Sequence, residues 1–230
     1  MEILAIIPAR GGSKGIPRKN LREVCGKPLV VYTIEASLNS KYITKTVLST
    51  EDKEITKVGE TFGAQVIERP HELAEDKTKT APVMLHVVRT LALEGYKPDY
   101  IVLLQPTCPL RDAKYIDAAF DFYFENLERG FDSCFSGYHA GKTHALWKKC
   151  HNTRVQALYD YRKRPRRQDE AEHYDLICEN GAFYALSYEK FVQYEDFIGH
   201  NPCVYLTEKV VDIDTEEDLK KIEDCLNKNN

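Results

Sequence analysis

The first loop of this chain combines glycine with positive charge. Residues 8–20 read PARGGSKGIPRKN and follow a short apolar run at residues 2–7. Glycines let backbone N–H groups approach an anion closely and form a nest around phosphate oxygens. Arg10 and Lys14 add charge, and Ser13 adds a hydroxyl donor. This composition predicts a loop that holds the phosphates of a nucleotide, and the alternative is a solvated surface loop.

A pair of carboxylates lies near the other end of the chain, in the string VDIDTEEDL. Asp212 and Asp214 are separated by one residue, so both face the same way on an extended strand. Two adjacent carboxylates repel unless a cation joins them. Hard oxygen ligands beside a phosphate substrate favour Mg²⁺, with Mn²⁺ as a substitute. We therefore predict a metal site at this pair; the alternative is that Asp214 begins the last helix.

The opening loop does not follow either of two common phosphate-binding patterns. A Walker loop requires Gly-Lys-Ser/Thr at its end, whereas Lys14 is followed by Gly15. The GKT at 141–143 has Ser136 where that pattern requires its first glycine. The Gly-x-Gly-x-x-Gly dinucleotide pattern is also absent from the sequence. A nucleotide site here must belong to another class.

Short apolar runs alternate with segments of helical periodicity over roughly the first 130 residues. Strands are expected at 2–7, 45–50, 64–69 and 99–105, and helices at 27–40, 51–63, 80–95 and 112–130. This alternation predicts an α/β fold with a Rossmann-like, mostly parallel sheet and helices on both faces. In such a sheet ligands bind at the carboxyl ends of the strands, where the opening loop lies.

The alternation then stops. We expect one domain, 1–230, with an antiparallel excursion at 135–178 that carries the basic run RKRPRR. Strands are expected to return at 181–187 and 203–207. A closing helix is expected at 215–229, with Thr215 as N-cap and Asp218 at the capping-box position.

Composition narrows the class of protein. The net charge of the 230 residues is −4, so no global positive field favours nucleic acid or a membrane surface. No apolar run approaches the length of a membrane span. Seven scattered cysteines without a Cys-x-x-Cys pattern predict reduced thiols. A cytoplasmic protein without a membrane or nucleic-acid partner is expected.

Four strings together carry a resemblance to a known family. They are ARGGSKGIPRKNL, LLQPTCPLR, RPRRQD with ENGAFY, and VDIDTEEDL. In this order and at similar spacing, over nearly the whole chain, they resemble the acylneuraminate cytidylyltransferases, also called CMP-N-acetylneuraminate synthetases. The resemblance implies a nucleotidyltransferase-type fold and an enzyme that uses Mg²⁺. The implied reaction converts CTP and a sialic-acid-like, nine-carbon 3-deoxy-ulosonic acid into a CMP-sugar and pyrophosphate.

The resemblance also implies roles for individual residues. Arg10, Lys14 and Asp212 would be catalytic, and Asp212 and Asp214 would hold the metal. Nucleotide contacts would come from Ala9, Arg10, Gly11, Gly12, Ser13, Lys14, Asn20 and Thr80. Sugar contacts would come from Gln105, Thr107, Lys142, Arg167 and Gln168. The excursion would pair two protomers in a homodimer and cover the neighbouring active site.

One departure leaves the sugar open. Cys178 and Glu179 stand where many relatives of this family have Arg-Pro before Asn-Gly. The substrate expected first is N-acetylneuraminate, and the alternatives are legionaminate, pseudaminate and 3-deoxy-manno-octulosonate. The alternative from another class of protein is a nucleotide- or RNA-binding module that uses the basic run.

Overall fold

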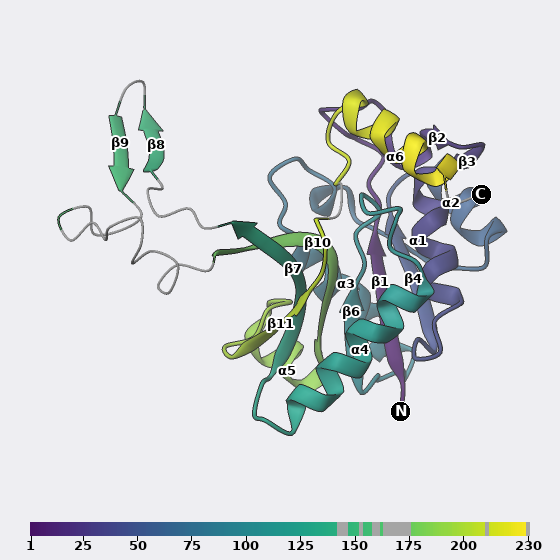
Figure 1. Cartoon of the computed structure of the whole chain (residues 1–230). Coiled ribbons are helices and arrows are strands. Elements are labelled where there is room, and N and C mark those ends of the chain that lie inside the picture. Colours follow the sequence, from purple (N-terminus) through teal and green to yellow (C-terminus); the bar gives the residue numbers. More distant parts are fainter. Residues whose placement is uncertain (142–146, 152–153, 158–161, 163–175, 210–211, 229–230) are drawn as a thin grey trace.

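A seven-stranded sheet forms the centre of the protein. The computed structural model describes residues 1–141, 147–151, 154–157, 162, 176–209 and 212–228 (Figure 1). The strands of the sheet are β1 (Ile3–Pro8), β4 (Lys45–Thr50), β5 (Gln65–Glu68), β6 (Tyr100–Leu103), β7 (Ser133–Gly141), β10 (Leu176–Ser187) and β11 (Pro202–Leu206). Their spatial order is β11-β7-β10-β6-β1-β4-β5. All neighbours are parallel except β10, which is antiparallel to both β6 and β7. The predicted mostly parallel sheet is confirmed.

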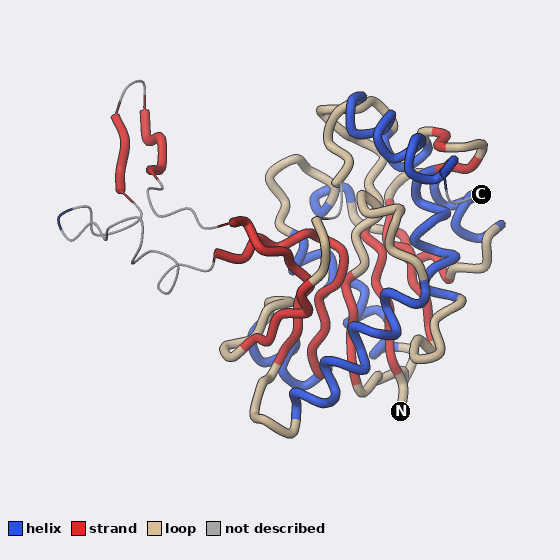
Figure 2. The backbone as a smooth tube through the Cα atoms, viewed as in Figure 1, coloured by secondary structure: helices blue, strands red, loops and turns tan. Residues whose placement is uncertain are grey.

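Helices cover both faces of this sheet (Figure 2). They are α1 (Leu29–Leu38), α2 (Lys53–Thr61), α3 (Thr80–Leu93), α4 (Ala113–Leu127), α5 (Tyr188–Tyr194) and α6 (Glu216–Lys228). Side chains of α1, α2 and α4 share one apolar core, and those of α3 and α5 share the core on the opposite face. The elements that were not predicted are α5, the hairpin of β2 (Glu23–Val24) and β3 (Lys27–Pro28), and two 3₁₀ turns, η1 (Lys19–Leu21) and η2 (His71–Leu73).

The alternation of side chains along β1 explains why its sequence is continuously apolar. Ile3, Ala5 and Ile7 lie in the core beneath α1, α2 and α4. Leu4 and Ile6 lie in the core beneath α3 and α5. Successive residues of a strand point to opposite faces, and here both faces are covered, so no position favours a polar side chain. The loop after Pro8 therefore starts from a rigid, central strand.

A third apolar cluster joins the two ends of the chain. Ile16 of the opening loop and Ile213 of the acidic segment (residues 212–214) are both fully buried in it. Leu219 and Ile222 of α6 belong to the same cluster. Val24 and Leu29 complete the cluster. Because these residues bury one another, α6 holds the acidic segment against the opening loop.

The first turn of α6 carries the predicted capping box. The Asp218 N–H donates to Thr215 Oγ1 at 3.3 Å, and the Thr215 N–H donates to Asp218 Oδ2 at 3.0 Å. The helix itself begins at Glu216. The alternative that Asp214 begins the last helix is therefore wrong, and the Asp214 carboxylate is left for another role.

Thr215→Ala is expected to lower the free energy of unfolding by about 1 kcal/mol, because it removes the N-cap hydroxyl of α6. Chemical denaturation measures this loss. Thr215→Ser keeps a hydroxyl at the same position and should behave as wild type. If the alanine variant is as stable as the serine variant, the capping hydrogen bonds contribute nothing to the stability of α6.

Part of the predicted excursion is described. β7 and β10 run antiparallel from Ser133/Leu186 to Gly141/Leu176. β8 (Trp147–His151) and β9 (Arg154–Ala157) form a separate antiparallel pair. Within the described parts of the chain, no helix is long and apolar enough to cross a membrane. Six of the seven cysteines are described as free thiols: Cys25, Cys108, Cys134, Cys178, Cys203 and Cys225.

Candidate active site

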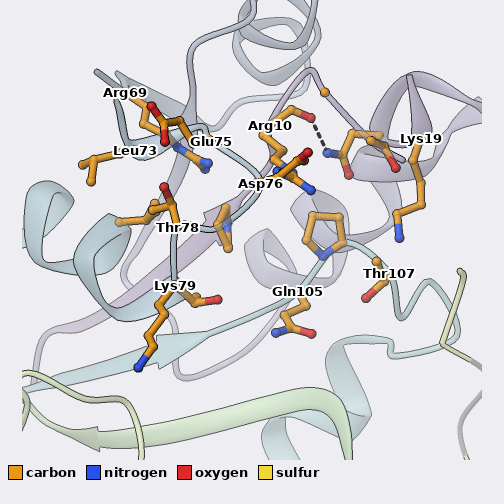
Figure 3. Close-up of a pocket in the computed structure, with 17 residues that line it drawn as sticks. Arg10, Lys19, Arg69, Leu73, Glu75, Asp76, Thr78, Lys79, Gln105 and Thr107 are labelled. Atoms are coloured by element: carbon orange, nitrogen blue, oxygen red, sulfur yellow. Dashed lines mark hydrogen bonds and ion pairs between the residues drawn. The ribbon is translucent and has the colours of Figure 1, made fainter. Parts of the chain in front are cut away.

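A polar cavity lies at the carboxyl ends of β1, β5 and β6. Its volume is about 280 Å³, and residues of the opening loop, of segment 69–80 and of the loop after β6 line it (Figure 3). Four cations line this cavity: Arg10, Lys19, Arg69 and Lys79. Glu75 and Asp76 are the acidic residues of the lining. We name this space the cation-lined cavity; its charge suits a polyanion such as a triphosphate.

The opening loop contributes to this cavity in two ways. Gly12, Ser13 and Asn20 line it, as does Arg10. A Cβ atom on Gly12 would meet nothing within 4 Å, so the backbone there is open to an incoming ligand. Asn20 is buried, and its Nδ2 donates to the Arg10 carbonyl at 2.9 Å. Asn20 therefore fixes the shape of the loop as well as facing the cavity.

Two residues that were predicted to contact the nucleotide lie beneath the cavity instead of lining it. Ala9 is fully buried, and its N–H donates to the Ser49 carbonyl of β4. The Gly11 N–H donates to Glu51 Oε1 at 2.7 Å, so it is not free for a phosphate oxygen. Both residues support the loop from below.

The remaining predicted nucleotide residues are at the cavity or at its rim. Thr80, the first residue of α3, lines the cation-lined cavity. Lys14 is not among the lining residues, but its Nζ lies 2.9 Å from Asp76 Oδ2, and Asp76 does line the cavity.

A second cavity of about 660 Å³ adjoins the first, and Gln105 lines both. Its wall also carries Asp212, Lys209 and Glu179. The Tyr184 hydroxyl donates to Glu179 Oε2 at 2.9 Å, which holds that carboxylate at the wall. We name this space the adjoining cavity; its carboxylate acceptors suit the hydroxyl groups of a ligand, and its two cations, Lys209 and Lys221, suit an anionic group.

Backbone and side-chain contacts connect the acidic segment to the opening loop and to the loop after β6. The Ile213 N–H donates to the Thr107 carbonyl at 3.1 Å. Lys19 Nζ donates to the Ile213 carbonyl at 2.7 Å and lies 3.2 Å from Asp214 Oδ1. A Cβ atom on Gly15 would collide with the Asp214 carbonyl, so only glycine permits this close approach. The predicted phosphate loop and the predicted acid pair therefore meet.

The environment of Asp212 fits a divalent cation. Although its side chain keeps access to solvent, surrounding protein atoms raise its pKa because they disfavour the charged form, and the charge of Asp214 adds to this. A hydrogen bond from Thr107 and the charge of Lys19 oppose the rise. Two carboxylates that disfavour each other, beside a cavity suited to phosphates, are the donor set that Mg²⁺ prefers.

Arg111 supports the loop of Gln105 from inside the protein. It is 1% exposed, and its guanidinium donates to the carbonyls of Gln105 and Ala182 and to the Thr33 hydroxyl at 3.1, 2.9 and 2.6 Å. Burial lowers its pKa to about 10. Its described partners are two carbonyls and a hydroxyl.

Several residues that line the two cavities were not predicted, among them Lys19, Arg69, Asp76 and Lys209. Arg69 could have been anticipated, because it directly follows β5 at the edge of the sheet where the opening loop lies. It is buried, its Nη2 donates to the Ser49 carbonyl at 2.7 Å, and burial lowers its pKa to about 10. The predicted sugar residues Lys142, Arg167 and Gln168 lie outside the described residues.

Comparison with known proteins places this geometry in a family. Residues 4–229 match the family described as cytidylyltransferase. The chain is 31% identical over 220 residues to the N-acylneuraminate cytidylyltransferase of Escherichia coli O18:K1:H7 (strain RS218 / NMEC), covering 94% of this chain but 49% of that protein. It is 32% identical over 224 residues to the pseudaminic acid cytidylyltransferase of Campylobacter jejuni subsp. jejuni serotype O:2 (strain ATCC 700819 / NCTC 11168), covering 96% and 94% of the two chains.

A solved structure shares the fold. It is CMP:2-keto-3-deoxy-manno-octonic acid synthetase complexed with CTP, which matches with a TM-score of 0.74 at 18% identity over the full length of both chains. At that identity the likeness concerns the fold alone. The chain spans about half the length of the Escherichia coli relative and nearly the whole length of the Campylobacter relative.

Proposed function

This chain belongs to the cytidylyltransferase family, and we propose that it transfers the cytidylyl group of CTP to a sialic-acid-like 3-deoxy-ulosonic acid, N-acylneuraminate first. The observation that carries this proposal is the pair of adjoining cavities that share Gln105. One suits a triphosphate, and the other suits a hydroxylated acid. Asp212 lines the adjoining cavity, and Asp214 lies 3.2 Å from Lys19, which lines the cation-lined cavity.

In the proposed reaction the anomeric hydroxyl of the sugar attacks the α-phosphorus of CTP. The bond from the α-phosphorus to the bridging oxygen breaks, pyrophosphate leaves, and the hydroxyl proton is released. Such a transfer depends on positioning and charge neutralisation more than on covalent chemistry. Arg10, Ser13 and Lys14 would hold the triphosphate, and Thr80 would contact the ribose or the base.

Asp212 and Asp214 would hold the divalent cation, Mg²⁺ or Mn²⁺ in its place. When bound, it would neutralise charge that develops on the transferred phosphoryl group. Lys19 already lies 3.2 Å from Asp214 Oδ1 and lines the cation-lined cavity, so it would keep this carboxylate oriented toward the phosphates.

On the sugar side, Gln105 would contact hydroxyl or N-acyl groups, because an amide both donates and accepts hydrogen bonds. Thr107 lines the cation-lined cavity and not the adjoining one, so it would meet the sugar only from the nucleotide side. Lys142, Arg167 and Gln168 complete the proposed sugar site, with Arg167 presenting its planar fork to the sugar carboxylate. Lys209, which lines the adjoining cavity, gives a further reason to propose an acidic sugar.

The excursion 135–178 would form the homodimer contact and cover the partner's active site. Figure 1 supports this proposal, since it shows the β8–β9 pair outside the layers formed by the seven-stranded sheet and its helices. An isolated pair of strands is only marginally stable in water, so a second protomer is a reasonable place for β8 and β9 to dock.

Other sugars are the nearest alternatives. Glu179, where many relatives have proline, places a carboxylate on the wall of the adjoining cavity and favours a sugar that offers hydroxyl or amide N–H donors there. Pseudaminate, legionaminate and 3-deoxy-manno-octulosonate all remain candidates. The basic run alone would fit an RNA-binding module.

A pyrophosphate-release assay tests the proposal. We expect release only when CTP, Mg²⁺ and an ulosonic acid are all present, with the highest kcat/KM for N-acetylneuraminate among the four acids named above. Reactions lacking one component, and reactions with UTP in place of CTP, serve as controls. Release without any acid, or no release together with salt-dependent retention of RNA, would contradict the proposed reaction.

A further inference from the structure

One carboxylate reaches across the cation-lined cavity to the opening loop. Asp76 lies on the segment between η2 and α3. Its Oδ1 lies 2.9 Å from Arg10 Nη1 (Figure 3), and its Oδ2 lies 2.9 Å from Lys14 Nζ. Each oxygen of the Asp76 carboxylate therefore forms an ion pair with one of the two cations that would hold the triphosphate.

This arrangement resembles the way in which an anionic ligand would sit. Arg10 and Lys14 belong to one loop, and Asp76 belongs to another segment that faces it across the cavity. The carboxylate is therefore an anion presented to the loop from outside, in the place where phosphate oxygens would bind. A phosphate and this carboxylate cannot occupy the same donors at the same time.

The contacts are of a kind that a stronger anion displaces. The side chain of Asp76 is 44% exposed and that of Lys14 is 77% exposed. Exposed ion pairs contribute little, because water screens both charges and the long side chains lose conformational freedom. Hydrogen bonding from Lys14 lowers the pKa of Asp76, so the carboxylate stays ionised over the working pH range.

We propose that Asp76 is an internal competitor for the triphosphate-binding cations. It holds Arg10 and Lys14 in the free protein, releases them to CTP, and takes them back as pyrophosphate leaves. The inference rests on the proposed function, since it assumes that this loop binds the triphosphate. It adds a residue that sets how tightly substrate and product are held.

The proposed competition has a defined consequence. A group that occupies the site in the free protein weakens CTP and pyrophosphate by the same factor, if both must displace it. Product release limits the turnover of many enzymes, and a built-in competitor favours release over rebinding. Because CTP would have additional contacts from its base and ribose, it would stay bound under conditions in which the equally weakened pyrophosphate is released.

Asp76→Asn tests this proposal by binding alone. Titration calorimetry with CTP and with pyrophosphate, both without divalent cation, should show Kd values about three- to tenfold lower than in wild type, as expected for the loss of two exposed ion pairs. The difference should shrink as salt is added, since salt screens exposed charges. The Ki for pyrophosphate as a product inhibitor should fall by a similar factor.

Glu54→Gln is the matched control. It removes one negative charge from an exposed ion pair with Arg18, which lies on the opening loop. Neither Glu54 nor Arg18 lines the cation-lined cavity. It should leave both Kd values within about twofold of wild type. Should Asp76→Asn fold poorly, Asp76→Ser makes the same measurement.

The outcomes distinguish a failure of the proposed function from a failure of the proposed competition by Asp76. If wild-type protein binds neither CTP nor pyrophosphate, the proposed function fails. If wild type binds both ligands but Asp76→Asn binds them equally or less tightly, the competition is refuted and Asp76 instead orients the two cations. Tighter binding that does not weaken with salt would also refute it.

Discussion

Replacing Asp212 with asparagine is expected to reduce kcat by at least about a hundredfold. The substitution removes one of two carboxylates that would hold the divalent cation, and loss of a single group that stabilises developing charge commonly costs this much. Asp212 lines the adjoining cavity and not the cation-lined one, so its effect should fall on turnover more than on the Kd for CTP. Pyrophosphate release at saturating CTP and sugar measures it.

The fold should survive this change. The pKa of Asp212 is raised in the folded protein by the protein atoms around it and by the charge of Asp214, which means that folding disfavours its charge. The contribution of such a group to stability is greatest below its unfolded pKa and is lost as the pH rises through the raised value. At neutral pH asparagine, which carries no charge, should therefore cost no stability through this effect.

Asp224→Asn provides the comparison for Asp212→Asn. It makes the same chemical change at an exposed position of α6, and Asp224 lines neither cavity. It should retain wild-type kcat. Near-normal turnover in Asp212→Asn would remove the metal assignment, whereas equal losses in both variants would point to a general effect of charge.

The α/β architecture followed from the sequence because its central strands are buried on both faces. The residues of β1 alternate between two cores, and this leaves an unbroken apolar run that is hard to mistake. The short helix α5 and the β2–β3 hairpin were missed, because segments of two to seven residues carry too little periodicity.

Local composition predicted individual segments of the site, but it did not predict which side chains from distant segments contact one another. Glycines and cations after β1 and the spaced acids near the C-terminus each suggested an anion or a metal on their own. The contact of Lys19 with Asp214 spans 195 residues, and that of Asp76 with Arg10 spans 66. Such pairs depend on tertiary packing, and no local pattern encodes them. For Lys19 and Asp214 that packing is the apolar cluster that contains Ile16 and Ile213.

The division of the site into two cavities also emerged only from the fold. Gln105 directly precedes the proline and threonine of QPT, and the sequence indicated a single sugar-binding role for it. In the structure it lines both cavities, and Gly181 approaches its amide closely enough that a Cβ atom would lie 2.9 Å from Oε1. Positive φ at Gly181, +74°, allows β10 to make that approach.

Arg111→Met is expected to lower the free energy of unfolding by about 2–4 kcal/mol. Arg111 satisfies the buried carbonyls of Gln105 and Ala182, and leaving such groups without a donor costs roughly 1–3 kcal/mol each. Methionine fills a similar volume and removes the unfavourable burial of a charge, which offsets part of the loss. Thermal unfolding should show a decrease in Tm of about 10 °C.

The loss should also reach the substrate. The carbonyl that Arg111 binds belongs to Gln105, whose side chain lines both cavities. Releasing that carbonyl loosens the loop, so the KM for the sugar should rise in Arg111→Met. Arg111→Lys keeps the positive charge but cannot span three acceptors with one ammonium, so it should not restore either property.

Arg89→Met separates burial from the mere loss of an arginine. Arg89 forms an exposed ion pair with Glu195 at 3.2 Å, and its removal should cost less than about 1 kcal/mol. If Arg111→Met proves as stable as Arg89→Met, the three hydrogen bonds only balance the cost of burying an unpaired cation. Arg111 would then be kept for the position of Gln105 alone, and the rise in KM would persist without any loss of stability.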